Sequence, residues 1–269
     1  MIKSISFEGL SKSPNFKYAA KLPFFERENG IEFGAGLTVL FGPNGCGKTT
    51  VLRMLADTLC ATQGGVSQVT EVAVREFLGV DGARDPVGLE VHHDGQPAIF
   101  CDPREAVGLS GGSFDDDFFE EGLVEVLGKR RMSHGQNGAR RINKTLDVLT
   151  GRVSAPKTIP RWKDRSQVNS VWMKALDLLE ARLAPSIPSG PLTLLLDEPE
   201  SNFSVAWQAR IWDRLANPSG PSHFQVIVAT HSMFSLNIPG ATYIEFEEGY
   251  LESATAAFAK KAAALAPRT

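Results

Sequence analysis

Residues 42–49 read Gly-Pro-Asn-Gly-Cys-Gly-Lys-Thr and match the pattern G-x-x-x-x-G-K-[ST] at every fixed position. Glycines let a loop wrap closely around phosphate oxygens, and the N–H groups at the start of a helix attract negative charge. Lys48 would supply positive charge to the β- and γ-phosphates, and Thr49 would offer a hydroxyl to Mg²⁺. The segment predicts a phosphate-binding loop, in which Cys46 occupies a variable position and has no redox role.

A second segment is an apolar run, Leu192 to Leu196, that ends in two carboxylates, Asp197 and Glu198. On a strand beside the phosphate loop, Asp197 would join the magnesium shell and Glu198 would polarise an attacking water. Acidic residues also end strands that simply meet solvent. Together with the phosphate loop, however, this pair favours phosphoryl transfer.

His231 follows a third apolar run, Gln225 to Ala229. Ligands bind at the carboxyl ends of the strands in parallel sheets, which is where this histidine would lie. It is predicted to hydrogen-bond the γ-phosphate and sense its loss. A histidine that only caps the strand is the alternative.

The surrounding pattern supplies elements that could position these residues. Leu37 to Phe41 predicts a buried strand before the loop, and leucines at helical spacing predict a helix from Thr49. Further strands are expected around 5–7, 192–196, 225–229 and 242–246, and helices over 118–127, 168–183 and 254–266. Two more strands, at 88–92 and 98–101, are expected to flank a turn at Asp94-Gly95. Strands separated by helices predict an α/β fold with a mixed or parallel sheet flanked by helices.

The composition of the chain limits the binding partners and the cellular location that are expected for it. The 269 residues carry a formal net charge of −3, so bulk charge gives no argument for nucleic-acid binding. The three cysteines show no disulfide or zinc spacing, which favours a reducing, cytoplasmic location. No apolar stretch is long enough to cross a bilayer, so direct membrane insertion is not expected. One domain spanning residues 1–269 fits this length.

Three segments of the chain resemble, in this order, the Walker A, Walker B and H-loop motifs of the ABC ATPase superfamily. They are Gly-Pro-Asn-Gly-Cys-Gly-Lys-Thr-Thr, Leu-Leu-Leu-Asp-Glu-Pro and Ala-Thr-His-Ser. The residues of these motifs are most similar to those of its stand-alone, non-transporter branch. That branch includes predicted soluble ATPases and heads related to DNA-repair, SMC and overcoming-lysogenization proteins. The resemblance covers nearly the whole chain in motif order, but the middle third only loosely.

The resemblance implies a P-loop NTPase fold of the ABC type, with ATP and Mg²⁺ as cofactors. It makes Lys48, Glu198 and His231 catalytic, and Thr49 and Asp197 metal-binding. The nucleotide-binding residues that it implies in the loop are Gly42, Pro43, Asn44, Gly45, Cys46, Gly47, Lys48, Thr49 and Thr50.

The family also carries a signature motif, usually Leu-Ser-Gly-Gly-Gln, which reaches across a dimer to the partner's γ-phosphate. Two segments compete for this role, 109–113 and 132–136. The second is preferred because it precedes a predicted helix at 137–149, whose N-terminus could bind an anion. The first runs into three aspartates, 115–117, that would repel phosphate. Ser133, Gly135 and Gln136 are therefore expected to bind nucleotide, within an inserted helical subdomain at about 103–185.

Other family positions stay open. Ser204 falls where the D-loop normally carries an aspartate. The Q-loop is either at Gln96 or at the strand end Cys101-Asp102. The adenine-stacking aromatic is either Phe16 or Tyr18, and ordinary packing would explain each equally well.

The expected function is a soluble ABC-type ATPase that hydrolyses ATP. Two copies would clamp two Mg-ATP head to tail and switch a further protein partner, in DNA maintenance or antiviral defence against phage. The alternatives are the ATP-binding subunit of a membrane transporter and an ATP-gated scaffold with little turnover. Basic residues at 129–131 and 140–141 could hold phosphates of ATP or nucleic acid, or form a solvated surface.

Overall fold

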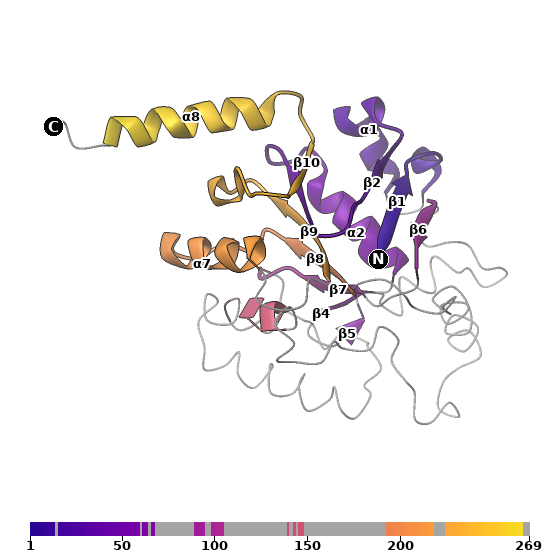
Figure 1. Ribbon diagram of the computed structural model, residues 1–269. Coiled ribbons are helices and arrows are strands. Elements are labelled where there is room, and N and C mark those ends of the chain that lie inside the picture. Colours follow the sequence, from indigo (N-terminus) through magenta and orange to yellow (C-terminus); the bar gives the residue numbers. More distant parts are fainter. Residues whose placement is uncertain are drawn as a thin grey trace.

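The computed structural model describes residues 1–13, 16–59, 61–63, 66–67, 89–94, 98–104, 139, 142–143, 145–147, 192–217 and 224–265. In this part of the chain, helices cover a largely parallel sheet, and the predicted α/β class is confirmed (Figure 1). The helices predicted over 118–127 and 168–183 lie outside the described residues, as does most of the subdomain predicted at 103–185.

The main sheet runs in the order β10-β3-β9-β8-β7-β4-β5. Its strands are β10 (Thr242–Glu245), β3 (Leu37–Phe41), β9 (Phe224–Thr230), β8 (Leu192–Asp197), β7 (Ala98–Cys101), β4 (Thr62–Gln63) and β5 (Val66–Ser67). Each neighbouring pair from β10 to β4 is parallel, and only β4 and β5 pair antiparallel. The carboxyl ends of β3, β8 and β9 therefore lie along one edge of the sheet, as the sequence argument required.

Both faces of this sheet are buried, which explains the continuous apolar runs. Side chains alternate along the strands, so Leu195 and Ile227 face one helix layer while Leu194 and Val226 face the other. The helices and 3-10 turns that surround the sheets are η1 (Leu10–Lys12), η2 (Lys17–Lys21), α1 (Pro23–Arg27), α2 (Lys48–Thr58), α7 (Val205–Ala216), η4 (Met233–Ser235) and α8 (Tyr250–Leu265). In Figure 1, α2 and α7 cover opposite faces.

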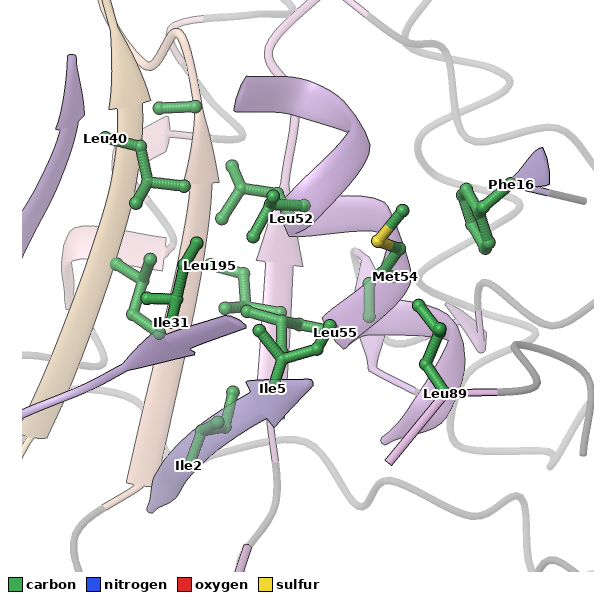
Figure 2. Packing of buried hydrophobic residues seen from close by; sticks show 14 of the residues in the cluster. Ile2, Ile5, Phe16, Ile31, Leu40, Leu52, Met54, Leu55, Leu89 and Leu195 are labelled. Atoms are coloured by element: carbon green, nitrogen blue, oxygen red, sulfur yellow. The ribbon is translucent and has the colours of Figure 1, made fainter. Parts of the chain in front are cut away.

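The larger core lies around α2, whose apolar face packs on the sheet as the leucine spacing predicts. Figure 2 shows Leu52 and Leu55 of α2 in one cluster with Leu195 of β8 and Ile5 of β1 (Ile2–Ser6). Because β1 closes this core from the far side, α2 is held between two sheets. The helix that follows the phosphate loop is thus among the most buried elements of the described chain.

A second, three-stranded antiparallel sheet has the order β2-β1-β6, with β2 at Gly30–Glu32 and β6 at Val91–His93. It is joined to the main sheet by the buried side chain of Gln225. The Gln225 amide nitrogen donates to the carbonyls of Ile2 (2.7 Å) and Gly34 (2.9 Å), and its oxygen accepts from Ile2 N (2.8 Å) and Thr193 Oγ1 (2.9 Å). One amide therefore uses its full bonding capacity to link the two sheets.

The prediction that strands at 88–92 and 98–101 flank one turn is wrong. β6 pairs with β1 in the small sheet, whereas β7 pairs with β8 in the main sheet. All four residues of β7 are buried, as a strand covered on both faces requires, while β6 is partly exposed. The turn signal at Asp94 marks the passage of the chain between two sheets.

The segment 137–149, predicted as a helix, is helical at those positions that the structure describes. Ile142 and Leu146 are buried against the α7 side of the sheet, and Arg214 of α7 pairs with Asp147 at 3.0 Å. The predicted C-terminal helix is confirmed as α8. It extends away from the body in Figure 1 and is exposed from Ala256 to Ala264. No helix in the described part of the chain is long and apolar enough to cross a bilayer.

Candidate active site

The phosphate-binding loop connects β3 to α2, as the motif predicts. Gly45 and Gly47 adopt positive φ angles of 80° and 110°, which residues with a side chain rarely take. A Cβ at Gly47 would also lie 2.6 Å from the Phe25 ring. Two glycines of the motif are therefore required by this backbone, independently of any ligand.

Lys48 lies over the loop that precedes it. Its Nζ donates to the carbonyls of Gly42 (2.8 Å) and Pro43 (2.7 Å), and the residue is buried. The ammonium group is therefore held at the centre of the loop, where phosphate oxygens would bind. Burial raises the pKa of the nearby Cys46 thiol.

Thr49 and Asp197 meet although they come from different elements. Thr49 Oγ1 at the start of α2 donates to Asp197 Oδ1 at the end of β8, over 2.9 Å. Asp197 is fully buried, and this burial raises its pKa to about 6 despite the Thr49 hydrogen bond and the nearby Arg104 charge. A hydroxyl beside a carboxylate is the oxygen donor set that Mg²⁺ uses when substrate phosphates supply further ligands. The residues fit the expected metal.

The described residues contain no group of three or more His, Cys, Asp or Glu side chains placed to hold a metal ion without further ligands. An Mg²⁺ ion that binds together with a nucleotide also takes ligands from the substrate phosphates. Thr49 and Asp197 would contribute the protein's share.

Glu198 directs its carboxylate into the same site. Its backbone has a φ of 43°, in the left-handed region that non-glycine residues seldom adopt. Glu198 N donates to Ala229 O at 2.8 Å, and Ser201 Oγ donates to Glu198 Oε2 at 2.8 Å. The first bond fixes the strained backbone and the second fixes the carboxylate, and strained backbone of this kind is typical of functional positions.

His231 lies just beyond β9, with Nδ1 3.4 Å from Glu198 Oε1. It is partly exposed and faces the carboxylate that would orient water. The site residues proposed from three separate motifs therefore lie together at one edge of the sheet.

Arg104 is the main residue that sequence reasoning missed. It follows β7, the neighbour of β8, and its guanidinium contacts Asp197 Oδ2 and Glu198 Oε2, each at 2.7 Å. Asp102 holds the same guanidinium, and this hydrogen bond with the surrounding carboxylates raises the pKa of Arg104 further above its usual value. A rule that flags polar residues at the end of every parallel strand would have found it.

A cavity of about 500 Å³ opens above the loop. It is lined in part by Asn44, Lys48 and Thr50, and Arg104 and Glu198 border it as well. This cavity has the size and polarity that a phosphate ligand requires.

The two candidates for an adenine-stacking aromatic differ in the structure. Phe16 is 5% exposed and belongs to the core, so it cannot stack on a ligand without leaving its packing. Tyr18 is 56% exposed and lines the cavity, with its hydroxyl 3.2 Å from Thr50 Oγ1. Tyr18 is the better placed of the two.

Several sequence predictions fall outside the described residues. These are Ser133, Gly135, Gln136, the competing segment 109–113, the basic clusters at 129–131 and 140–141, and the Q-loop candidate Gln96. The other Q-loop candidate, Asp102, ends β7 beside β8 and is buried.

Comparisons with known proteins agree with this geometry. A family model described as "AAA domain" matches residues 22–67, which span the phosphate loop. A second, described as "AAA domain, putative AbiEii toxin, Type IV TA system", matches residues 175–237, which include β8 and His231. Both therefore include segments that form the site.

Curated proteins with similar sequences are named as nucleotide-using proteins. The molybdenum import ATP-binding protein ModC of Albidiferax ferrireducens is 29% identical over 78% of this chain and 49% of its own length. The daunorubicin resistance ATP-binding protein DrrA3 of Streptomyces coeruleorubidus is 28% identical over 67% of the chain and 47% of its length. The proteasome-activating nucleotidase of Thermococcus onnurineus is 32% identical over 48% of the chain and 27% of its length. The chain thus spans about half or less of these relatives.

Proposed function

We propose that this chain, which belongs to the ABC/AAA-type ATPase superfamily, binds Mg-ATP above its phosphate loop and hydrolyses it to ADP and phosphate. One observation carries the proposal. The hydroxyl of Thr49, which starts the helix after the loop, and the carboxylate of Asp197, which ends β8, lie 2.9 Å apart in the site that Glu198 and Lys48 border. This is the arrangement that phosphoryl transfer by positioning and electrostatics requires.

Each residue has a distinct task in this proposal. Lys48 and the loop N–H groups bind phosphate oxygens, and Thr49 with Asp197 would hold Mg²⁺. When bound, the ion would neutralise phosphate charge. Glu198 orients and polarises the attacking water, and its fixed backbone keeps the carboxylate aimed before the nucleotide arrives. His231, 3.4 Å from that carboxylate, contacts the terminal phosphate and registers its loss.

The proposed working unit is a head-to-tail homodimer in the cytoplasm. Ser133, Gly135 and Gln136 of each copy would seal the nucleotide of the other, as the sequence resemblance implies. Closure on ATP and opening after hydrolysis would present two shapes to a further protein partner. Nucleic acid would reach the complex through the basic segments around residue 130.

Two biological settings have support. Antiviral defence is favoured by the family description that names an AbiEii toxin over residues 175–237, and DNA maintenance by the motif resemblance. The second candidate function, the ATP-binding subunit of a transporter, is favoured by the names of two relatives that match 78% and 67% of the chain. Purification of the ATP-trapped protein from its native cells separates them. A membrane-spanning companion would support the transporter, and a soluble effector would support the switch.

The catalytic proposal is tested with two substitutions. Lys48→Ala should abolish binding of a fluorescent ATP analogue, because the loop loses its central positive charge. Glu198→Gln should keep nucleotide binding and lower turnover by about 10²–10⁴-fold, the usual contribution of a positioned base. Lys12→Ala, at an exposed lysine outside the site, is the matched control and should change neither.

Melting curves verify that each variant is folded. Unchanged nucleotide binding by folded Lys48→Ala would refute the site. Turnover of wild type no faster than that of Glu198→Gln would instead identify an ATP-gated scaffold.

A further inference from the structure

We propose that Arg104 is a built-in counter-cation of the metal site, which occupies the Asp197 carboxylate until Mg²⁺ arrives with nucleotide and displaces it. This rests on the proposed Mg-ATP site. In this exchange Mg²⁺ replaces the Arg104 guanidinium at the Asp197 carboxylate.

The guanidinium group bridges three carboxylates. Nη2 donates to Asp197 Oδ2 and Nη1 to Glu198 Oε2, each over 2.7 Å. Nε donates to Asp102 Oδ1 at 2.9 Å, and Nη2 also contacts Asp102 Oδ2 at 3.0 Å. These are short, charge-assisted hydrogen bonds in the fork geometry that arginine favours.

The local charge shows why a cation is needed here. The Asp197, Asp102 and Glu198 side chains are only 0%, 3% and 14% exposed. Three carboxylates gathered with so little solvent repel one another strongly unless a positive group lies between them. Arg53 lies 3.9 Å from Asp102, at the edge of this group, whereas Arg104 contacts all three carboxylates.

The same contacts place Arg104 in competition with a metal ion. Asp197 uses Oδ1 for the Thr49 hydroxyl and Oδ2 for Arg104, so both of its oxygens are engaged. An ion bound between Thr49 and Asp197 would have to share this carboxylate with a guanidinium, and the two positive charges repel each other. Arg104 must therefore give up Asp197 for the metal to bind tightly.

The structure also gives Arg104 a way to move. Its backbone N and its Nε both bond to Asp102, and these bonds are independent of the two that reach Asp197 and Glu198. The side chain is 36% exposed and lines the cavity that Lys48 also lines. Released from Asp197, the guanidinium tip would remain beside the bound phosphates.

The experiment measures binding of Mn²⁺, as a spectroscopic substitute for Mg²⁺, to nucleotide-free protein by electron paramagnetic resonance. Wild type should bind Mn²⁺ weakly. Arg104→Met should bind it at least about tenfold more tightly, because the competing cation is gone. Millimolar Mg²⁺ alone should raise the melting temperature of Arg104→Met and leave that of wild type unchanged.

Two further variants make the result specific. Arg53→Met removes the other arginine beside Asp102 and should leave Mn²⁺ affinity at the wild-type value. Arg104→Lys keeps the charge but loses the fork, so it should fall between wild type and Arg104→Met. If Arg104→Met does not fold, Arg104→Lys decides alone. The proposal is then overturned if Arg104→Lys binds Mn²⁺ no more tightly than wild type does.

Failure of the exchange is distinguishable from failure of the ATP site. Wild-type protein that binds the ATP analogue with Mg²⁺, but shows the same nucleotide-free Mn²⁺ affinity as both Arg104 variants, would refute only the exchange. Wild-type protein that never binds the analogue would refute the proposed function.

Discussion

Glu200 is buried two residues beyond Glu198 and has a direct link to β9. Its Oε1 accepts a hydrogen bond from Thr230 Oγ1, while its Oε2 is buried and has no hydrogen-bond partner among the residues that the structure describes. Burial raises the pKa of Glu200 to about 7. The carboxyl group is therefore largely protonated in the folded protein under mildly acidic conditions.

This burial predicts a pH dependence of stability. A raised folded-state pKa contributes stability below the unfolded value near 4.5, and that contribution is lost as the pH rises through about 7. Glu200→Gln resembles the protonated form, so it should match wild type near pH 4 and exceed its free energy of unfolding by up to about 3 kcal/mol near pH 8. Urea titrations of nucleotide-free protein across this range provide the check. A difference that stays constant with pH would contradict the assignment.

At the same scale, the sequence predicts those polar site residues that belong to a motif and misses those that do not. Lys48, Thr49 and Asp197 stand in fixed patterns whose chemistry can be stated without coordinates. Arg104 stands in no motif, and its importance depends on β7 lying next to β8. Strand neighbours are set by packing across a long sequence distance, which local patterns do not report.

At the scale of elements, the two sheets meet at a polar group. Gln225 of β9 is fully buried and bonds to β1, to β8 and to the carbonyl of Gly34. The strand is apolar from Val226 to Ala229, and the amide that precedes this run fixes how the small sheet sits on the large one. Buried polar networks of this kind specify an arrangement when every member is satisfied.

Gln225→Met keeps the length of the side chain and removes its hydrogen bonds. It should lower the free energy of unfolding by about 3 kcal/mol or more, because buried backbone groups of β1 and the Thr193 hydroxyl lose their partners. Gln208→Met is the matched control, since Gln208 is half-buried and its side chain donates to Phe203 O at 3.0 Å. Its expected loss is about 1 kcal/mol. Equal losses in the two variants would show that Gln225 has no special role.

Element types were largely predictable, and one pairing was not. The strands before the phosphate loop and before Asp197 have apolar runs of strand length, and the helix that follows the loop has leucines at helical spacing. The turn signal at Asp94-Gly95 predicts that the strands on either side of it flank a single turn. Nothing local distinguishes a chain that folds back on itself from one that passes to another sheet.

At the scale of the whole molecule, the site is open on one side. The phosphate loop, Thr49, Arg104 and Glu198 of one copy of the chain line a cavity of about 500 Å³. The proposed second copy would cover it with the segment at Ser133, which lies outside the described residues. Resemblance to a signature motif, rather than geometry, supports that part of the proposal.

Dimerisation is testable with the slow variant. Glu198→Gln with ATP and Mg²⁺ should elute from a sizing column as a dimer, because nucleotide persists at the interface. The double variant Lys48→Ala/Glu198→Gln should remain monomeric and is the control. A Glu198→Gln protein that stays monomeric at saturating ATP would rule out the ATP-clamped pair.

The choice of signature segment has its own test. Ser133→Arg should retain ATP binding and lower turnover at least about tenfold, because it removes a donor to the partner's nucleotide. Ser110→Arg, in the competing segment, should leave turnover unchanged. The reverse result would show that the signature lies at 109–113.

The backbone at Glu198 has a consequence for attempts to make this protein sturdier. A left-handed conformation at a residue with a long side chain costs about 1–3 kcal/mol, and glycine would adopt it freely. Random variants ranked by heat resistance alone would thus be enriched in loss of the glutamate, and under the proposed role of Glu198 the selected variants would be stable but slow to hydrolyse ATP. Any directed-evolution campaign on this chain needs a turnover assay in the same selection round.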